Sequence, residues 1–185
     1  MAETQLQNFT VQEKLNKMDV DLIDVTVYPD ISDGGAGVSG DLLFLVTEIP
    51  NAVSVKGGAS ILQSVALISS GDGGKTVATG PIDLVITSDS TPLIDEDGAA
   101  ETGDAVTATP DIDSPATVID GFCGFVRFPG LITVSSLAAV ASKENIGMVC
   151  KAVADTRSLY VWGIVKNTSD YDEGEMIIRF GFIKD

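Results

Sequence analysis

The stretch SILQSVALISSGDGGKTVATGPIDLVIT, residues 60–87, holds two strand patterns separated by a glycine-rich turn. Residues 60–69 and 81–87 are rich in Val, Ile and Thr, which suit a pleated, half-buried surface. GDGG at 71–74 is typical of a hairpin turn, because glycine adopts positive φ values without steric cost. The stretch therefore predicts two strands of a β-rich protein.

Similar short strands are expected on both sides of this stretch. DLLFLVTEI at 41–49 is a continuous apolar run, which indicates burial on both faces. Lys143-Glu144-Asn145 has the composition of a turn. The other expected strands are 20–28, 52–55, 117–119, 124–128, 131–134, 146–153, 159–165 and 176–183. Strands of this length and spacing, without alternating long helices, predict an all-β, jelly-roll-like β-sandwich with a short N-terminal arm or helix.

The sequence divides into an arm and a single domain. Residues 1–19 are expected to form the arm, with a short helix at about 10–18, and residues 20–185 the β-sandwich. Residues 89–115 are acidic, turn-rich and poor in large apolar side chains, so they predict a long surface excursion from the sandwich.

The expected helix in the arm begins with a capping box. The Thr10 hydroxyl can accept a hydrogen bond from a backbone N–H, while Glu13 reaches back to the start of the helix. Leu15 and Met18 share one face of that helix, and with Phe9 they are the candidate interface residues. Two interpretations stay open: the arm docks on a partner, or the helix packs on its own domain.

The net charge of −16, from 27 acidic and 11 basic residues, limits the classes of partner. A field of this sign repels phosphate backbones and anionic membranes, so neither nucleic acid nor membrane is an expected partner. A basic protein surface could still attract the chain.

The residue types that most enzymes and metal sites need are scarce. The chain has no histidine, which excludes a Ser–His–Asp triad and removes the commonest zinc ligand. The single tryptophan and low aromatic content disfavour a sugar-cleaving groove. We expect no enzymatic activity, no catalytic residue and no cofactor.

The two cysteines are too few for a disulfide framework or a four-cysteine zinc site. Cys123 and Cys150 lie in apolar, strand-like surroundings, so buried free thiols are favoured, with one cross-strand disulfide as the alternative.

The acidic excursion contains a candidate calcium site. Asp95-Glu96-Asp97, Glu101 and Asp104 offer the carboxylate oxygens that hard cations prefer. The glycine of an EF-hand loop is missing at its required position, so a solvated loop without metal is the favoured interpretation.

Aromatic residues gather near the end of the chain. They are Tyr160, Trp162, Tyr171, Phe180 and Phe182. Within their expected strands, Tyr160 and Trp162 share one face, as do Phe180 and Phe182. Core packing is the favoured interpretation, and a subunit interface is the alternative.

No signal peptide or membrane-spanning run is visible, so synthesis in the cytoplasm of the producing cell is expected.

Two runs of the sequence resemble a family of small β-rich proteins of tailed phages, often encoded near the major capsid protein. The first comprises GGASILQSVALISSGDGG and PIDLVITSDSTPLIDEDGA, and the second is RSLYVWGIVKNTSDYDEGEMIIRFGFIKD. The closing pattern of the family falls on Leu159, Tyr160, Val161, Tyr171, Gly174, Arg179, Gly181, Phe182 and Asp185. The resemblance covers residues 54–185, and the chain departs from it at Trp162 and in the acidic stretch from Asp95.

This resemblance implies a virion structural protein, specifically a decoration (cement) protein on the outside of the phage head. Its expected partners are the major capsid protein and further copies of itself, as a homotrimer or another homo-oligomer. A different virion component, such as a tail, fibre or host-surface-binding module, is the alternative. A cellular adhesin is a further one, which would need an export signal. The resemblance supplies no catalytic residue.

Overall fold

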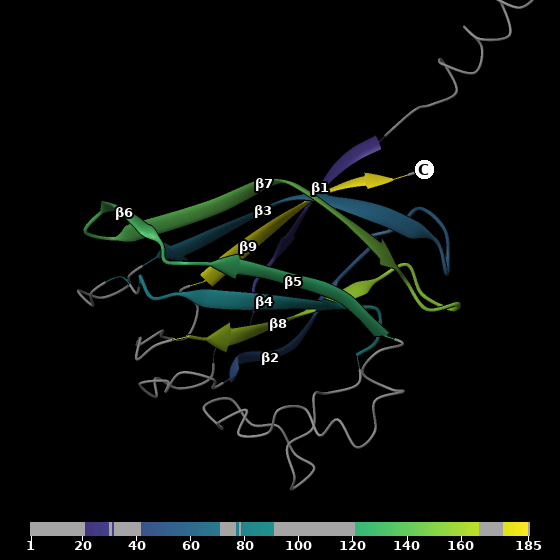
Figure 1. Ribbon diagram of the computed structural model, residues 1–185, viewed down its shortest axis with the longest axis horizontal. Helices are drawn as coiled ribbons and strands as arrows, with labels where there is room; N and C mark the ends of the chain where they lie inside the picture. The colour runs from purple at the N-terminus through teal and green to yellow at the C-terminus, as the bar shows by residue number, and fades with distance from the viewer. Residues whose placement is uncertain are drawn as a thin grey trace, which may run out of the picture.

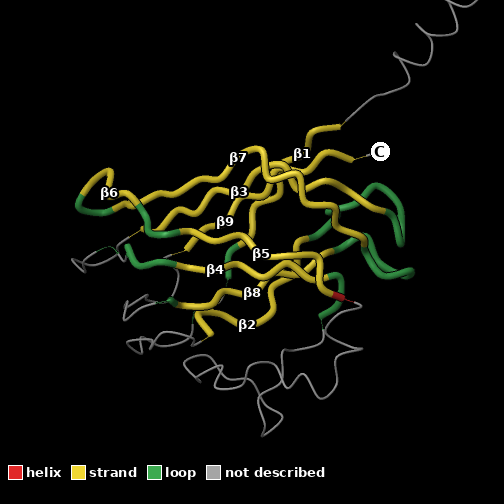
Figure 2. Tube along the Cα trace, in the orientation of Figure 1, coloured by secondary structure: helices red, strands yellow, loops and turns green. Residues whose placement is uncertain are grey.

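The computed structural model describes residues 21–29, 31, 42–70, 77, 79–90, 121–166 and 176–184. These residues form nine strands joined by loops and turns (Figures 1 and 2). The strands are β1 (Asp21–Val27), β2 (Leu42–Ile49), β3 (Ala59–Ser70), β4 (Ile82–Thr87), β5 (Phe122–Phe128), β6 (Ile132–Ser135), β7 (Ala138–Lys151), β8 (Leu159–Val165) and β9 (Met176–Lys184).

The strands form two layers, which Figure 1 shows nearly edge-on. One sheet has five strands in the order β1-β9-β3-β7-β6, and the other has four in the order β2-β8-β4-β5. Pairing is antiparallel and nested: β1 pairs with β9, β2 with β8, β3 with β7 and β4 with β5. This arrangement is a jelly roll, with β6 added at one edge, and it confirms the expected fold class.

The core lies between the two sheets, where alternate residues of each strand point inward. On β9 these are Met176, Ile178, Phe180 and Phe182, all buried. The rings of Phe180 and Phe182 stack with their centroids 6.1 Å apart. Core packing of these two phenylalanines is therefore confirmed.

Trp162 does not join that core. Its strand neighbour Val161 belongs to the core cluster, so Trp162 points to the opposite face of β8. It is nevertheless fully buried, and its indole N–H donates a hydrogen bond of 3.3 Å to Thr87 Oγ1. Burial of Trp162 is therefore confirmed, but on the face of β8 opposite Val161, and Tyr160, which shares the Trp162 face, is half-buried.

Two local predictions are wrong. Residues 52–55 form part of the β2–β3 connection, in which Ala52 and Val53 are buried and the Val53 N–H donates to the Arg157 carbonyl (3.1 Å). Lys143-Glu144-Asn145 lies inside β7. The turn-like residues there mark an irregularity in a continuous strand.

That irregularity is a bulge opposite Gln63. Leu62 pairs with Met148 and Ser64 with Glu144, so three residues of β7 face one residue of β3. Asn145 and Gly147 have positive φ (57° and 68°), which explains the turn-like composition. The Gln63 side-chain amide donates to Asn145 Oδ1 (3.1 Å) and ties the two strands together.

Several predicted features lie outside the described residues. They are the arm 1–19 with its helix at 10–18, the strand 117–119 and, apart from Asp89 and Ser90, the acidic excursion 89–115. The strong strand expected at 41–49 is confirmed as β2, with Leu42, Leu43 and Phe44 all buried.

The pairing of β2 with β8 requires a glycine at position 163. Gly163 lies opposite Phe44, and a Cβ built there would overlap the Phe44 ring. We expect Gly163→Ala to lower the free energy of unfolding by about 1–3 kcal/mol, as overpacking of a core does. Urea denaturation measures the change. Gly121→Ala is the matched control, because a Cβ there meets its nearest atom at an ordinary 3.5 Å. An equal loss in both variants would contradict the packing argument.

Candidate protein-binding surface

The outer face of the five-stranded sheet carries more aliphatic side chains than a solvent-facing surface requires. On β3 the residues Leu62, Val65 and Leu67 point into the core, whereas Ile61 and Ile68 point outward. The bulge at Gln63 shifts the alternation by one residue, so both ends of the strand bury one apolar set and present another.

The first group of outward side chains, here named the Leu22 row, crosses four strands. Leu22 pairs with Ile183, Ile183 with Ile61, and Ile61 with Val149. Leu22 and Val149, at the two ends of the row, are each 66% exposed, and Ile61 is 38% exposed. Four neighbouring aliphatic side chains therefore form a continuous apolar strip on the surface.

The second group, named the Ile132 row, lies nearer the other end of the sheet. Ile177 pairs with Ile68, Ile68 with Val140, and Val140 with Ile132. Ile132 is 73% exposed and the other three are partly buried. The sheet thus presents two aliphatic strips on the same outer face.

The Ile132 row continues onto the β6–β7 hairpin. The hairpin forms one end of the five-stranded sheet in Figure 1. β6 is the edge strand of that sheet, which packs against a sheet of only four strands. Val134 and Leu137 are exposed there in addition to Ile132. The turn is held by a hydrogen bond from the Leu137 N–H to Ser135 Oγ (3.2 Å). Ile132 is therefore displayed on an ordered hairpin.

The band between the two rows consists of small and charged side chains. A Cβ at Gly181 would overlap Ser64 Oγ, so glycine permits the close approach of β9 to β3. Two lines of paired residues cross the sheet in this band. One is Asp24, Gly181, Ser64 and Glu144, and the other is Thr26, Arg179, Ala66 and Ser142. The outer face therefore carries two apolar rows, separated by a band of small and charged side chains.

Charge is distributed unevenly between the described segments and the rest of the chain. The described segments contain the acidic residues Asp21, Asp24, Glu48, Asp83, Asp89, Glu144 and Asp155. They contain the basic residues Lys56, Arg127, Lys143, Lys151, Arg157, Lys166, Arg179 and Lys184. These nearly cancel, so the net charge of −16 resides in the sequence outside these segments. The described segments by themselves are therefore nearly neutral.

On the outer face of the four-stranded sheet, Asp83 forms ion pairs with Arg127 and Lys166. Arg127 donates two hydrogen bonds of 2.8 Å to the two carboxylate oxygens of Asp83, and Lys166 Nζ lies 3.9 Å from Asp83 Oδ2. Asp83 is buried, and its hydrogen bonds and charge raise the pKa of Arg127. The Arg127 guanidinium also lies 5.6 Å from the centre of the Phe125 ring. Both carboxylate oxygens are occupied, so the cluster is structural.

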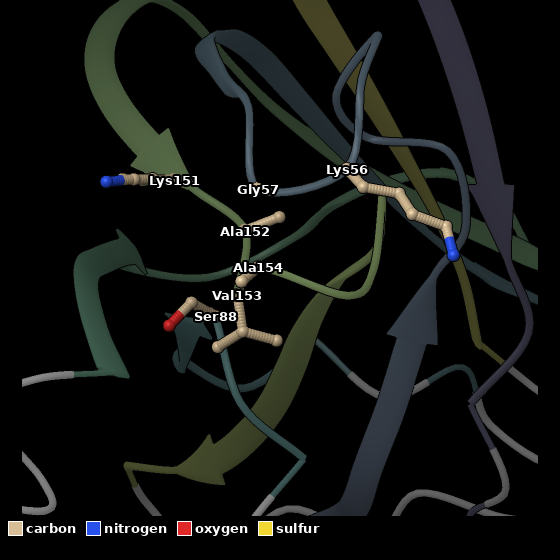
Figure 3. Close-up of a pocket in the computed structure, with 7 residues that line it drawn as sticks. All are labelled: Lys56, Gly57, Ser88, Lys151, Ala152, Val153 and Ala154. Carbon is tan, nitrogen blue, oxygen red and sulfur yellow. The ribbon is translucent and has the colours of Figure 1, made fainter.

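A hollow of roughly 520 Å³ lies between the β2–β3 and β7–β8 connections (Figure 3), at the end of β7 opposite the β6–β7 hairpin. Its lining residues are Lys56, Gly57, Ser88, Lys151, Ala152, Val153 and Ala154. Hydrogen bonds from Gly57 N to Thr156 O (3.0 Å) and from Ala152 N to Gly58 O (3.0 Å) join the two connections that form it. The amino groups of Lys56 and Lys151 point away from Val153, to opposite sides (Figure 3). These lining residues do not converge on a ligand as a binding site would.

The two thiols lie against each other across the sandwich. Cys123 on β5 is half-buried, Cys150 on β7 is buried, and both are free. A hydrogen bond between the two side chains lowers the pKa of Cys123 to about 7, against the opposing effect of burial, with help from the Lys151 backbone. The same contact and burial raise the pKa of Cys150. The expectation of free thiols is confirmed.

The candidate interface residues named from the sequence, Phe9, Leu15 and Met18, lie outside the described residues, as does the acidic segment 95–104. Sequence reasoning missed the two aliphatic rows. A signal was present in ASILQSVALISS (59–70), which has apolar residues on both faces. The register that joins its outward members to other strands could not be read from one strand.

The described residues offer neither a metal-binding cluster nor a helix able to span a membrane. Within these segments no group of three or more His, Cys, Asp or Glu is placed to hold a metal ion. In the same part of the chain, no helix has the length and apolarity needed to cross a membrane.

Comparison with known proteins gives no family assignment. No protein-family model matches the chain, and neither does any curated protein. Among solved structures, a chain of Desmodium yellow mottle tymovirus is similar, with 12% identity, a TM-score of 0.28 and coverage of 89% of this chain and 86% of its own. A chain from sacbrood virus of honeybee in expansion state I has 11% identity, a TM-score of 0.31 and coverage of 91% and 85%. Both likenesses are partial, and the fold assignment rests on the strand pairing described above.

The thiol pair gives a pH-dependent prediction. Because Cys123 is more exposed than Cys150 and its thiolate accepts the hydrogen bond, iodoacetamide should label Cys123 first, with a half-maximal rate at a pH of about 7. Cys150→Ala removes the donor and should move the midpoint to higher pH. Mass spectrometry of labelled peptides measures both. A midpoint for the intact protein at the value of an ordinary cysteine would contradict the thiol contact.

Proposed function

We propose that this chain is a virion structural protein that binds the outside of a tailed-phage head and stabilises it. The observation that carries the proposal is the exposed Ile132 row, which continues onto the β6–β7 hairpin. Exposed apolar strips of this kind are typical of surfaces that bind other proteins. The resemblance of residues 54–185 to head-associated phage proteins supports a capsid protein as the partner.

The geometry supports binding to a protein more than binding to a small molecule. The Ile132 row lies on a sheet face and continues on a hairpin at the edge of the sandwich. The hollow at the other end is lined mainly by small side chains. A shallow apolar surface bordered by polar groups has the anatomy of a protein–protein interface.

The proposed partners are the major capsid protein and further copies of this chain. A decoration protein binds only the assembled head, so its binding free energy stabilises that state by mass action. A capsid lattice offers equivalent sites around local symmetry axes, for which a homotrimer or another homo-oligomer is suited. The protein would be made in the host cytoplasm and reside on the capsid surface.

The composition supports a binding role without catalysis. The absence of histidine from the sequence removes the most common general base at neutral pH. The acidic excess makes nucleic acid and anionic membranes unfavourable partners. The described segments themselves carry nearly equal numbers of acidic and basic residues, which supports contact with another protein.

Binding to heads tests the proposal directly. The purified protein should co-sediment, at a fixed ratio to the capsid subunit, with heads of its own phage that have been stripped of it, and should raise their resistance to heat. Absence of binding by the intact protein would contradict the head assignment and would favour a tail, fibre or host-surface role, which cell-binding assays address.

Single substitutions locate the surface. We expect Ile132→Asp to weaken head binding by at least about tenfold, because it places a charge in an apolar contact. Its melting temperature should stay near that of the parent, since Ile132 is 73% exposed. Val153→Asp, at the far end of the sandwich beside the hollow, is the matched control and should bind normally. Equal binding by both variants would show that the Ile132 row is not the contact.

A further inference from the structure

The Leu22 row is a second apolar surface, separate from the one that the proposed function uses. Along β9, its member Ile183 is six residues from Ile177 of the Ile132 row, a separation of roughly 20 Å. Leu22 and Val149 are mostly exposed, although they are aliphatic and lie on ordered strands. A continuous strip of this kind is expected to be covered in the folded protein.

The position of the strip indicates what covers it. Leu22 is the second residue of β1, and its neighbour Asp21 pairs with Lys184 at the end of the sheet. The chain that precedes Asp21 therefore joins the sheet directly beside the Leu22 end of the row. The start of β1 and the end of β9 lie side by side there (Figure 1).

The sequence of that preceding segment is suited to an apolar surface. After the capping box at Thr10 and Glu13, residues Val11, Leu15 and Met18 follow the i, i+4, i+7 spacing of one helical face. A helix this short is marginal in water, so it needs a surface on which to bury its apolar face.

The dimensions of the segment and the row agree. A helix over residues 10–18 is about 13 Å long at 1.5 Å per residue. The row crosses three gaps between strands, which amount to about 14 Å. Asp19 and Val20 can bridge about 7 Å between the helix and β1.

We propose that residues 10–18 fold as a short helix that packs across the Leu22 row of their own chain. The occupant is the chain's own segment because the two-residue connection keeps it near the row at a high effective concentration, which a second molecule cannot match in dilute solution. Leu15 and Met18 then serve as internal contacts of the sandwich, and the Ile132 row is left for the partner.

A double-mutant cycle tests this contact. Leu15→Ala and Val149→Ala are each expected to reduce the equilibrium constant for folding by about threefold to tenfold, the effect of losing a half-buried aliphatic contact. In the double variant, the equilibrium constant for folding should fall by clearly less than the product of the two single-variant factors, because each substitution removes the same contact. Leu15→Ala combined with Ile132→Ala is the matched control, and there the effects should multiply. Multiplicative behaviour in both pairs would overturn the proposal.

Two further measurements separate the possible occupants. Deletion of residues 1–18 should leave the sandwich folded and increase the fluorescence of a bound hydrophobic dye, and Val149→Asp in the truncated chain should reverse that increase. Sedimentation velocity should show that the coupling between Leu15 and Val149 is present in a monomer and independent of concentration. A coupling that appears only in a dimer would overturn the assignment to the chain's own segment. None of these measurements uses phage heads, so their outcome is independent of the proposed function.

Discussion

The hydrogen-bond register between β3 and its two neighbours determines which side chains share each face of the larger sheet. β3 pairs with β9 on one side and β7 on the other, and both pairings change register between Leu62 and Ser64. Because strand side chains alternate, a slip of one residue would turn Leu62, Val65 and Leu67 outward and bring Ile61 and Ile68 inward. In the observed register Gly181 approaches Ser64 so closely that a Cβ at position 181 would overlap the serine hydroxyl, so this pairing requires glycine there. The core and the two aliphatic rows therefore depend on the same set of hydrogen bonds.

Nested pairing places the two candidate surfaces at different ends of the molecule. The first strand pairs with the last, so the start of β1 and the end of β9 meet beside the Leu22 row. The β6–β7 hairpin displays the Ile132 row away from them (Figure 1). The pairs β1–β9 and β2–β8 join residues far apart in sequence, and such long-range contacts have a high loop-closure entropy and fold slowly. Once formed, these pairings hold the exposed aliphatic side chains in fixed positions on the faces of the sandwich.

The acidic residues of the sequence are distributed unevenly between the described segments and the remaining sequence. The acidic excess lies outside the described segments, where it opposes non-specific association through its net repulsion. The described segments by themselves are nearly neutral, which supports contact with another protein. Burial of one row by the chain's own segment would further limit unwanted contacts, because only the Ile132 row would remain available.

The sequence alone was sufficient for the fold class, because strand patterns, glycine turns and the lack of long helices are local properties that each predict β structure. It also predicted β2, the inward Phe180 and Phe182, and two free thiols. It misassigned residues 143–145 as a turn, because a bulge inside a long strand uses the same positive-φ residues as a hairpin. It also placed Tyr160 and Trp162 on one face of their strand, but it could not tell which face turns toward the other sheet, since both faces of β8 are apolar. The sequence could not predict the two aliphatic rows, since each row takes one residue from each of four strands. Only the register of those strands in the folded sheet brings such residues together.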